Sequence, residues 1–131
     1  MRKLLMIEDD LDDRYITETY FADKGYKVAL EFFEGSADVI EHLSRLNAAE
    51  LPDVIALDPG KRALETLEAL KTHPRFKEIP VVVITEVVPA SRIKEAYRLG
   101  ANSVIQKPST HKLTEETIGA FAKYWFEVVE L

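Results

Sequence analysis

Polar side chains that could bind a metal ion or a phosphoryl group follow four apolar runs of this chain. They are Glu8 and Asp9, Asp58, Thr85, and Lys107. The runs that precede them are residues 4–7, 54–57, 81–84 and 104–105. If these runs are parallel buried strands, their carboxyl ends share one edge of a sheet, so the polar side chains meet in one crevice. Such a crevice could hold a cation and a phosphoryl group together.

The carboxylates indicate metal-assisted phosphoryl chemistry. Glu8 and Asp9 supply the hard oxygen ligands that Mg²⁺ prefers. Asp58 ends a central apolar run, where a carboxylate is unfavourable unless it binds a cation or reacts. Beside the acid pair, Asp58 could ligate the same ion and attack phosphorus to give an acyl phosphate. Taken alone, Asp58 could instead cap the following helix through Pro59-Gly60.

Three further acids follow the pair and have a simpler explanation. Asp10 is suited to cap a helix that begins at residue 11, and Asp12 and Asp13 fall in its first turn, where negative charge complements the helix dipole. We therefore expect only Glu8 and Asp9 to point toward the crevice.

Thr85 and Lys107 could complete the site. The Thr85 hydroxyl could donate to a phosphoryl oxygen, and Lys107 could pair with the same group, or with Asp58 when no phosphoryl group is present. The Lys107-Pro108 bond is also a candidate cis peptide, since proline makes that geometry accessible. Each residue is ordinary by itself, and their matching positions after apolar runs favour a shared role.

The elements that must position these residues alternate along the chain. Strands are expected at residues 3–8, 27–33, 53–58, 80–85 and 103–106. Helices are expected at residues 11–24, 36–49, 61–72, 90–99 and 112–130. This alternation predicts an α/β fold with a parallel sheet that is covered on both faces through right-handed crossovers.

Local signals set the ends and faces of the helices. Gly25 and Gly100 are expected to end the first and fourth helices, and Ser36 to cap the second. On the first helix, five residues are expected to share one side: Leu11, Tyr15, Ile16, Thr19 and Ala22.

Size and composition narrow the function classes. The chain has 131 residues and a net charge of -6, with lysines and arginines dispersed, which suits one domain and argues against nucleic-acid binding. It has no cysteine, so disulfides and thiolate chemistry are excluded. The apolar run after Met1-Arg2-Lys3 is too short for a signal peptide or a membrane span. We expect a cytoplasmic protein with no membrane partner.

Four segments resemble the receiver domain of two-component response regulators, in order and spacing, over nearly the whole chain. They are LLMIEDDLDD, PDVIALD, IPVVVIT and GANSVIQKP. The resemblance implies a single receiver domain over residues 1–131. It also implies a flavodoxin-like doubly wound sheet of five parallel strands, in the order 2-1-3-4-5, with five helices.

The same resemblance implies a role for each site residue. Asp58 is the phosphoacceptor, Thr85 the switch hydroxyl and Lys107 the invariant lysine. Mg²⁺ is held by Asp9 and Asp58, and through water by Glu8. The phosphoryl group comes from a histidine kinase or a phosphotransfer protein, and the receiver catalyses only its own phosphorylation. It is therefore a signalling domain that switches a protein-interaction surface, and not an enzyme.

Three positions depart from the family pattern. The segment after Asp58 is shorter than usual, so the backbone metal ligand falls on Gly60 in an altered connection. Glu86 stands where a small residue is common, beside the switch hydroxyl. Val104 replaces the usual aromatic residue, so the output switch would act through the backbone or the fourth helix.

These departures keep other functions open. The first is a receiver-like interaction module that no longer accepts phosphate. The second is a phosphatase with an aspartyl intermediate, for which Gly60 occupies the position of the needed general acid. A flavin-binding protein fits less well, because no phosphate loop follows the first strand.

The terminal segment suggests a second surface. Its apolar residues, Phe121, Tyr124, Trp125, Val128 and Val129, form a broad stripe that either covers the sheet or favours self-association. If it favours self-association, we expect a homodimer through the face of the fourth helix, fifth strand and fifth helix. The tail is also similar to stand-alone receivers that partner bacteriophytochrome histidine kinases.

Overall fold

Five strands form one parallel sheet in the computed structural model, which describes residues 1–58, 62–86 and 89–131. They are β1 (Arg2–Ile7), β2 (Val28–Phe33), β3 (Val54–Leu57), β4 (Val81–Thr85) and β5 (Ser103–Gln106). The strand order is β2-β1-β3-β4-β5, which confirms the predicted doubly wound sheet. Runs rich in Val, Ile and Leu suit such strands, because their branched side chains pack on a pleated surface.

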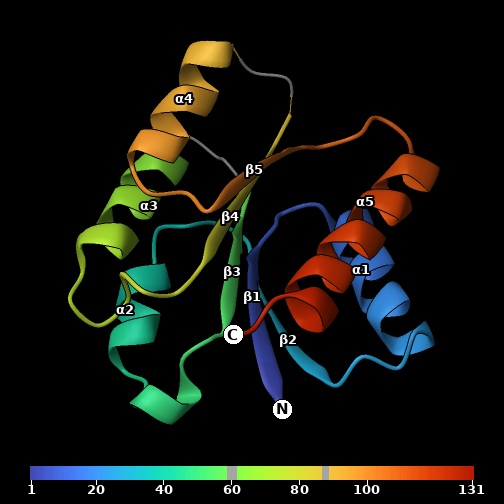
Figure 1. The fold of residues 1–131 in the computed structure, drawn as a ribbon, viewed down its shortest axis with the longest axis horizontal. Coiled ribbons are helices and arrows are strands. Elements are labelled where there is room, and N and C mark those ends of the chain that lie inside the picture. Colours follow the sequence, from blue (N-terminus) through green and yellow to red (C-terminus); the bar gives the residue numbers. More distant parts are fainter. Residues whose placement is uncertain (59–61, 87–88) are drawn as a thin grey trace.

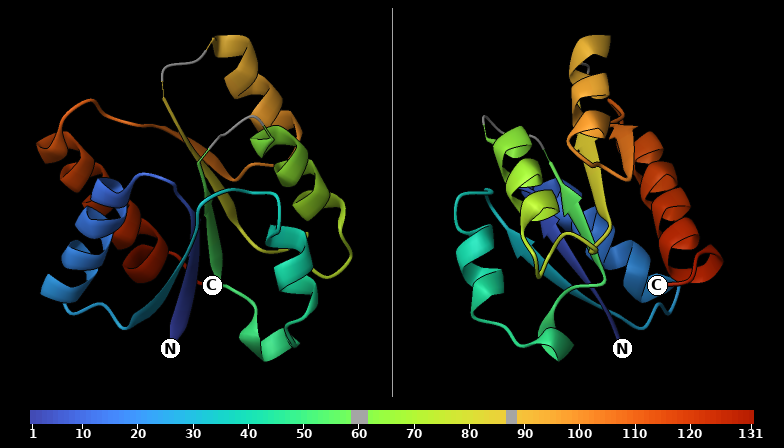
Figure 2. Two further views of the ribbon diagram at one scale, coloured as in Figure 1. Left: turned by 180° about the vertical axis from the view of Figure 1, so that it is seen from behind. Right: turned by 60° about the vertical axis from the view of Figure 1, so that its left-hand side comes forward.

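Helices cover both faces of this sheet. They are α1 (Leu11–Asp23), α2 (Val39–Ser44), α3 (Ala63–Thr72), α4 (Ala90–Arg98) and α5 (His111–Lys123), with a 3₁₀ turn at Ala48–Glu50 and a π-helical turn at Tyr124–Val128. α1 and α5 lie on one face, and α2, α3 and α4 lie on the other (Figure 1, Figure 2). The predicted fold class, with five α-helices, is therefore confirmed.

Alternating side chains of the central strands divide the core into two layers. Leu5 and Ile7 of β1 pack under α2 and α3, whereas Leu4 and Met6 pack under α1 and α5. All four residues of β3 are buried, as expected for a strand covered on both faces. This packing fixes the direction of the strand ends and so the direction of the groups that follow them.

The second helix is shorter than predicted and starts later. It begins at Val39, so the expected cap at Ser36 is wrong. Its continuation to residue 49 is also wrong, because Asn47 and Glu50 form a capping box in which each side chain bonds the backbone N–H of the other. This local pairing satisfies the backbone outside an α-helix and starts the 3₁₀ turn.

α1 buries a different face from the one predicted. Leu11 and Tyr15 are 72% and 70% exposed, whereas Thr17 and Phe21 are buried. The Thr17 hydroxyl can be buried because it donates to the Asp13 carbonyl at 2.8 Å. The inward face of α1 therefore follows residues 13, 17 and 21, at intervals of one helical turn.

The last helix changes its hydrogen bonding after Lys123. The π-helical turn keeps Trp125 buried, and Phe121, one turn earlier, is buried too. Tyr124 and Val128 remain exposed. The Tyr26 hydroxyl donates to Glu127 and ties this turn to the segment before β2. Part of the apolar stripe thus covers the sheet and part remains at the surface.

β5 lies at the edge of the sheet, next to β4 alone. The Tyr97 hydroxyl of α4 accepts a hydrogen bond from the Val104 N–H of this strand at 3.1 Å. The expected cis peptide at Lys107-Pro108 is wrong, since the described peptide bonds are trans, the geometry that X-Pro amides prefer. Within the described residues, none of the helices combines the length and hydrophobicity that a bilayer span requires.

Gly100 ends α4, as predicted, in a conformation that side chains rarely adopt. Its φ is 109°, and an added Cβ would lie 2.8 Å from Lys71 Cγ. We expect Gly100→Ala to lower the free energy of unfolding by about 2 kcal/mol or more, because strain and overlap add. Urea denaturation measures this loss.

Gly25→Ala is the matched control for that substitution. Gly25 ends α1 at a φ of 70°, and its Cβ would meet no atom within 4 Å. It should lose only about 1 kcal/mol, from backbone strain. Equal losses in the two variants would show that the contact with Lys71 contributes nothing.

Candidate functional site

The predicted polar residues meet at the carboxyl ends of the strands. Asp9 follows β1, Asp58 follows β3, Thr85 ends β4 and Lys107 follows β5, and all four line a cavity of about 400 Å³. Glu8, directly after β1, is buried beside them and bonds Lys107. The sheet thus brings together the five side chains that the sequence separates.

Lys107 is the centre of an ion-pair network. Its Nζ lies 3.0 Å from Glu8 Oε1 and 3.1 Å from Asp58 Oδ2, which confirms the predicted contact with Asp58. It also lies 2.7 Å from Oδ2 of Asp13, a residue of α1. The side chains of all four residues are at most 20% exposed, so water screens these charges only weakly.

The acids beside Lys107 fit a divalent cation. Glu8, Asp9 and Asp58 each offer one carboxylate oxygen, and these atoms lie within 4.8 Å of one another. Three hard oxygen donors at this spacing suit small cations such as Mg²⁺ or Mn²⁺. Gly60, the expected backbone ligand, lies outside the described residues.

The pKa values of two of these groups are raised, with opposite effects on their charge. Burial, together with contact with Asp58, raises the pKa of Glu8 to about 8, although Lys107 partly offsets this. Burial lowers the pKa of Lys107, but Asp13, Glu8 and Asp58 raise it well above its usual range. Lys107 is therefore a permanent cation, whereas Glu8 can take up a proton near neutral pH.

The Thr85 side chain is buried at the cavity and is engaged locally. Its hydroxyl donates to the Glu86 carbonyl at 3.1 Å. The Thr85 carbonyl accepts the Lys107 N–H, so the two predicted residues are also joined through the backbone. A bound anion would have to draw the hydroxyl away from Glu86, by rotation about one side-chain bond.

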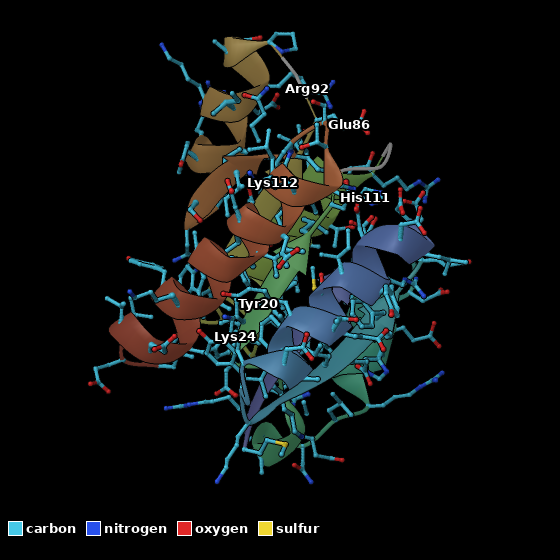
Figure 3. The ribbon with its side chains drawn as sticks, turned by 90° about the vertical axis from the view of Figure 1, so that its right-hand side faces the viewer. Tyr20, Lys24, Glu86, Arg92, His111 and Lys112 are labelled. Carbon is cyan, nitrogen blue, oxygen red and sulfur yellow. The ribbon has the colours of Figure 1, made fainter. Side chains whose placement is uncertain are left out.

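Two of the positions singled out in the sequence, Glu86 and Val104, border the same cavity. Glu86 and Arg92 lie beside it with opposite charges (Figure 3). Val104, Ile93 and Ala96 line its apolar side, so the cavity reaches α4 where a larger side chain at residue 104 would fill it. The shortened segment after Asp58 falls in the undescribed range 59–61.

Sequence reasoning missed two residues of the site. Asp13 was assigned to the helix dipole, but its carboxylate contacts Lys107. The signal was available in its spacing, because Asp13, Thr17 and Phe21 share one helical face. Arg14 donates from Nε to the Glu8 carbonyl at 2.6 Å and lies over the Phe32 ring, which holds the acid pair in place.

By contrast, the assignment of Asp10 is confirmed. Its carboxylate accepts the Asp12 and Asp13 N–H groups at 2.9 and 3.1 Å and so caps α1.

The chain is similar in sequence and in fold to known proteins. The family model described as "Response regulator receiver domain" matches residues 4–118. Chemotaxis protein CheY1 of Helicobacter pylori is 29% identical over 119 residues, which cover 88% of this chain and 93% of that protein.

Two solved structures share the fold at 24% identity with TM-scores of 0.90. One is the Mn²⁺-bound form of response regulator Rcp1, and the alignment covers 100% of this chain and 99% of that chain. A response regulator named Rcp1 is known from Synechocystis sp.. The other is the phosphorylated cyanobacterial phytochrome response regulator RcpA, and the alignment covers 99% of this chain and 97% of that chain.

The raised pKa of Glu8 predicts how stability depends on pH without divalent metal. The folded protein binds more protons than the unfolded chain between the ordinary value of 4.5 and about 8, so the free energy of unfolding falls as pH rises through this range. This loss approaches about 1 kcal/mol per pH unit near the middle of the range. Urea denaturation in a chelator, at several pH values, measures it.

Glu8→Gln isolates this contribution, because all other titrating groups remain. We expect the variant to gain stability relative to the wild type as pH rises from 5 toward 8, and to gain little at the acidic end. A constant difference between the two proteins across the range would contradict the raised pKa.

Proposed function

The chain belongs to the family of response regulator receiver domains, and on that premise we propose that Asp58 accepts a phosphoryl group from a phosphohistidine. The donor would be a histidine kinase or a phosphotransfer protein. The observation that carries the proposal is the contact of Lys107 with Asp58 and Glu8, which converge with Asp9 into a cluster of three carboxylates. Proteins of this family are signalling proteins, and the reaction we propose is a self-catalysed transfer.

Each residue contributes to positioning and charge balance. An Asp58 carboxylate oxygen attacks phosphorus, a bond from oxygen to phosphorus forms, and the bond from phosphorus to the imidazole nitrogen breaks. Mg²⁺ held by Glu8, Asp9 and Asp58 would neutralise charge between the nucleophile and the phosphoryl group. Such transfers depend mainly on alignment and electrostatic stabilisation, and little on covalent chemistry by the protein.

Lys107 and Thr85 would bind the phosphoryl group once it is on Asp58. The Lys107 ammonium exchanges its contact with Asp58 for a phosphoryl oxygen, and the Thr85 hydroxyl leaves the Glu86 carbonyl to donate to another. Because Val104 has no ring to reorient, the change reaches the face of α4, β5 and α5 through the backbone of β4 and α4. Two discrete packings of such a face can be distinguished by a partner.

Glu86 favours a second candidate function. Its carboxylate borders the same cavity and would repel a phosphoryl group, as expected of an interaction module that works without phosphate. The two functions differ in whether Asp58 reacts, so one experiment separates them. The single domain over residues 1–131, the cytoplasmic location and the phytochrome-class kinase stay predictions.

We expect the wild-type protein to gain one phosphoryl group on incubation with phosphoramidate and Mg²⁺, because Mg²⁺ bound by the three carboxylates, together with the Lys107 ammonium, would neutralise the transferred charge. Intact-protein mass spectrometry measures the gain. Asp58→Asn and removal of Mg²⁺ with a chelator should each abolish it, whereas Asp12→Asn, at an exposed position of α1, should leave it unchanged. No gain in the wild type, with Mg²⁺ bound or absent, would favour the interaction module.

The face of α4, β5 and α5 is the surface through which we propose a homodimer. Tyr97 and Tyr124 are about half exposed. Tyr124 lines a hollow of about 610 Å³ together with Ile105 and Trp125. We expect light scattering at micromolar concentration to give a dimer mass, and Tyr124→Ser to lower it. Tyr15→Ser, an exposed tyrosine of α1, is the control. A monomeric mass for the wild type throughout would contradict the proposal.

A further inference from the structure

Asp13 has a contact that the phosphoryl-transfer scheme does not use. It lies in the first turn of α1 and not at a strand end, yet its Oδ2 is 2.7 Å from Lys107 Nζ. This is shorter than the distances from Nζ to Glu8 and Asp58, which are 3.0 and 3.1 Å. Both partners are 15% exposed at their side chains. A surface charge near a helix terminus would show neither feature.

The helix fixes Asp13 through its backbone and leaves its carboxylate available. The Asp13 N–H donates to Asp10, which takes the capping role, and the Asp13 carbonyl accepts the Thr17 hydroxyl at 2.8 Å. Thr17 is buried under α1. The carboxylate is therefore presented by a rigid element, which holds a partner more accurately than a loop does.

Asp13 also differs from the other two partners of Lys107. Glu8 and Asp58 belong to the carboxylate cluster that fits a cation, and Asp58 is the group that the proposed function assigns as the phosphoacceptor. Among the described side chains, Asp13 is the ion-pair partner of the Lys107 ammonium that lies outside that cluster. Its ion pair competes with neither the cation nor the phosphoryl group.

We propose that Asp13 is a positioning residue that holds the Lys107 ammonium beside Asp58 before and after phosphoryl transfer. This inference rests on the proposed function and adds a residue to it. An ammonium donates three hydrogen bonds. One can pass from Asp58 to a phosphoryl oxygen while the contact with Asp13 persists, so Lys107 changes partner without leaving the site.

The packing of α1 against α5 restricts movement of Asp13 relative to Lys107. α1 lies beside α5, which begins shortly after Lys107 (Figure 1). The two helices approach closely at Gly119, where an added Cβ would meet the Tyr20 hydroxyl at 2.7 Å. Asp13 and Lys107 therefore join two segments that are already packed together.

The first test compares rates of phosphorylation by phosphoramidate with saturating Mg²⁺. We expect Asp13→Asn to slow the reaction roughly 10-fold, since small errors in placing a charged group are costly. Asp12→Asn removes the same charge from the same helical turn, but at an exposed position, and should not change the rate. Asp13→Glu should recover part of it. Equal rates for Asp13→Asn and Asp12→Asn would overturn the proposal.

The second test asks whether Asp13 acts through Lys107. In a Lys107→Gln background, Asp13→Asn should not slow the reaction further, whereas two independent roles would give multiplying losses. Urea denaturation of the same four proteins supplies a readout that needs no phosphorylation. The effects of the two substitutions on the unfolding midpoint should be non-additive. Additive effects would contradict a stabilising contact between Asp13 and Lys107.

The two tests also separate this inference from the function on which it rests. If the wild type gains no phosphoryl group, the proposed function fails and so does a role for Asp13 in transfer. If the wild type reacts but Asp13→Asn matches Asp12→Asn, only the positioning role fails.

Discussion

The structure depends on one balance of charge at the carboxyl edge of the sheet. Glu8, Asp13 and Asp58 place their carboxylates around a single ammonium, with Asp9 close by. One lysine cannot neutralise this group, and weakly screened like charges are costly. The protein meets the excess by taking up a proton at Glu8 or, as we propose, a divalent cation. A cation bound here would relieve the repulsion among the clustered carboxylates.

The order of the strands turns this balance into a site. β1 has β2 on one side and β3 on the other, so Glu8 and Asp58 leave adjacent strands at the point where the sheet order reverses. Crevices of doubly wound sheets form at such points. β4 and β5 then bring Thr85 and Lys107 in from the other side. The hydrophobic core layers under the strands set the distances between the polar groups of the site.

Much of this arrangement could be predicted from the sequence, for a physical reason. Buried parallel strands need continuous apolar runs, so β3, β4 and β5 were located within one residue, and the groups after them followed. The inward face of α1 differs from the predicted one, because it includes Asp13 and Thr17, whose polar atoms are satisfied by partners within the fold. Hydrophobic periodicity cannot reveal a face that is buried through hydrogen bonds and ion pairs. The 3₁₀ turn before β3 likewise arises from a side-chain pairing of Asn47 and Glu50 that competes with the helix.

Tyr97 bears on how β5 can pair with a strand of another molecule. The outer strand of an open sheet presents backbone donors and acceptors that can template a strand from another molecule, which is a common route to aggregation. Here a phenolic oxygen from the preceding helix occupies the Val104 donor of that strand. The strand is also only four residues long and has Ser103 and Gln106 at its ends. The chain can therefore offer side chains on this flank to a partner while its backbone is protected against fibril-like growth.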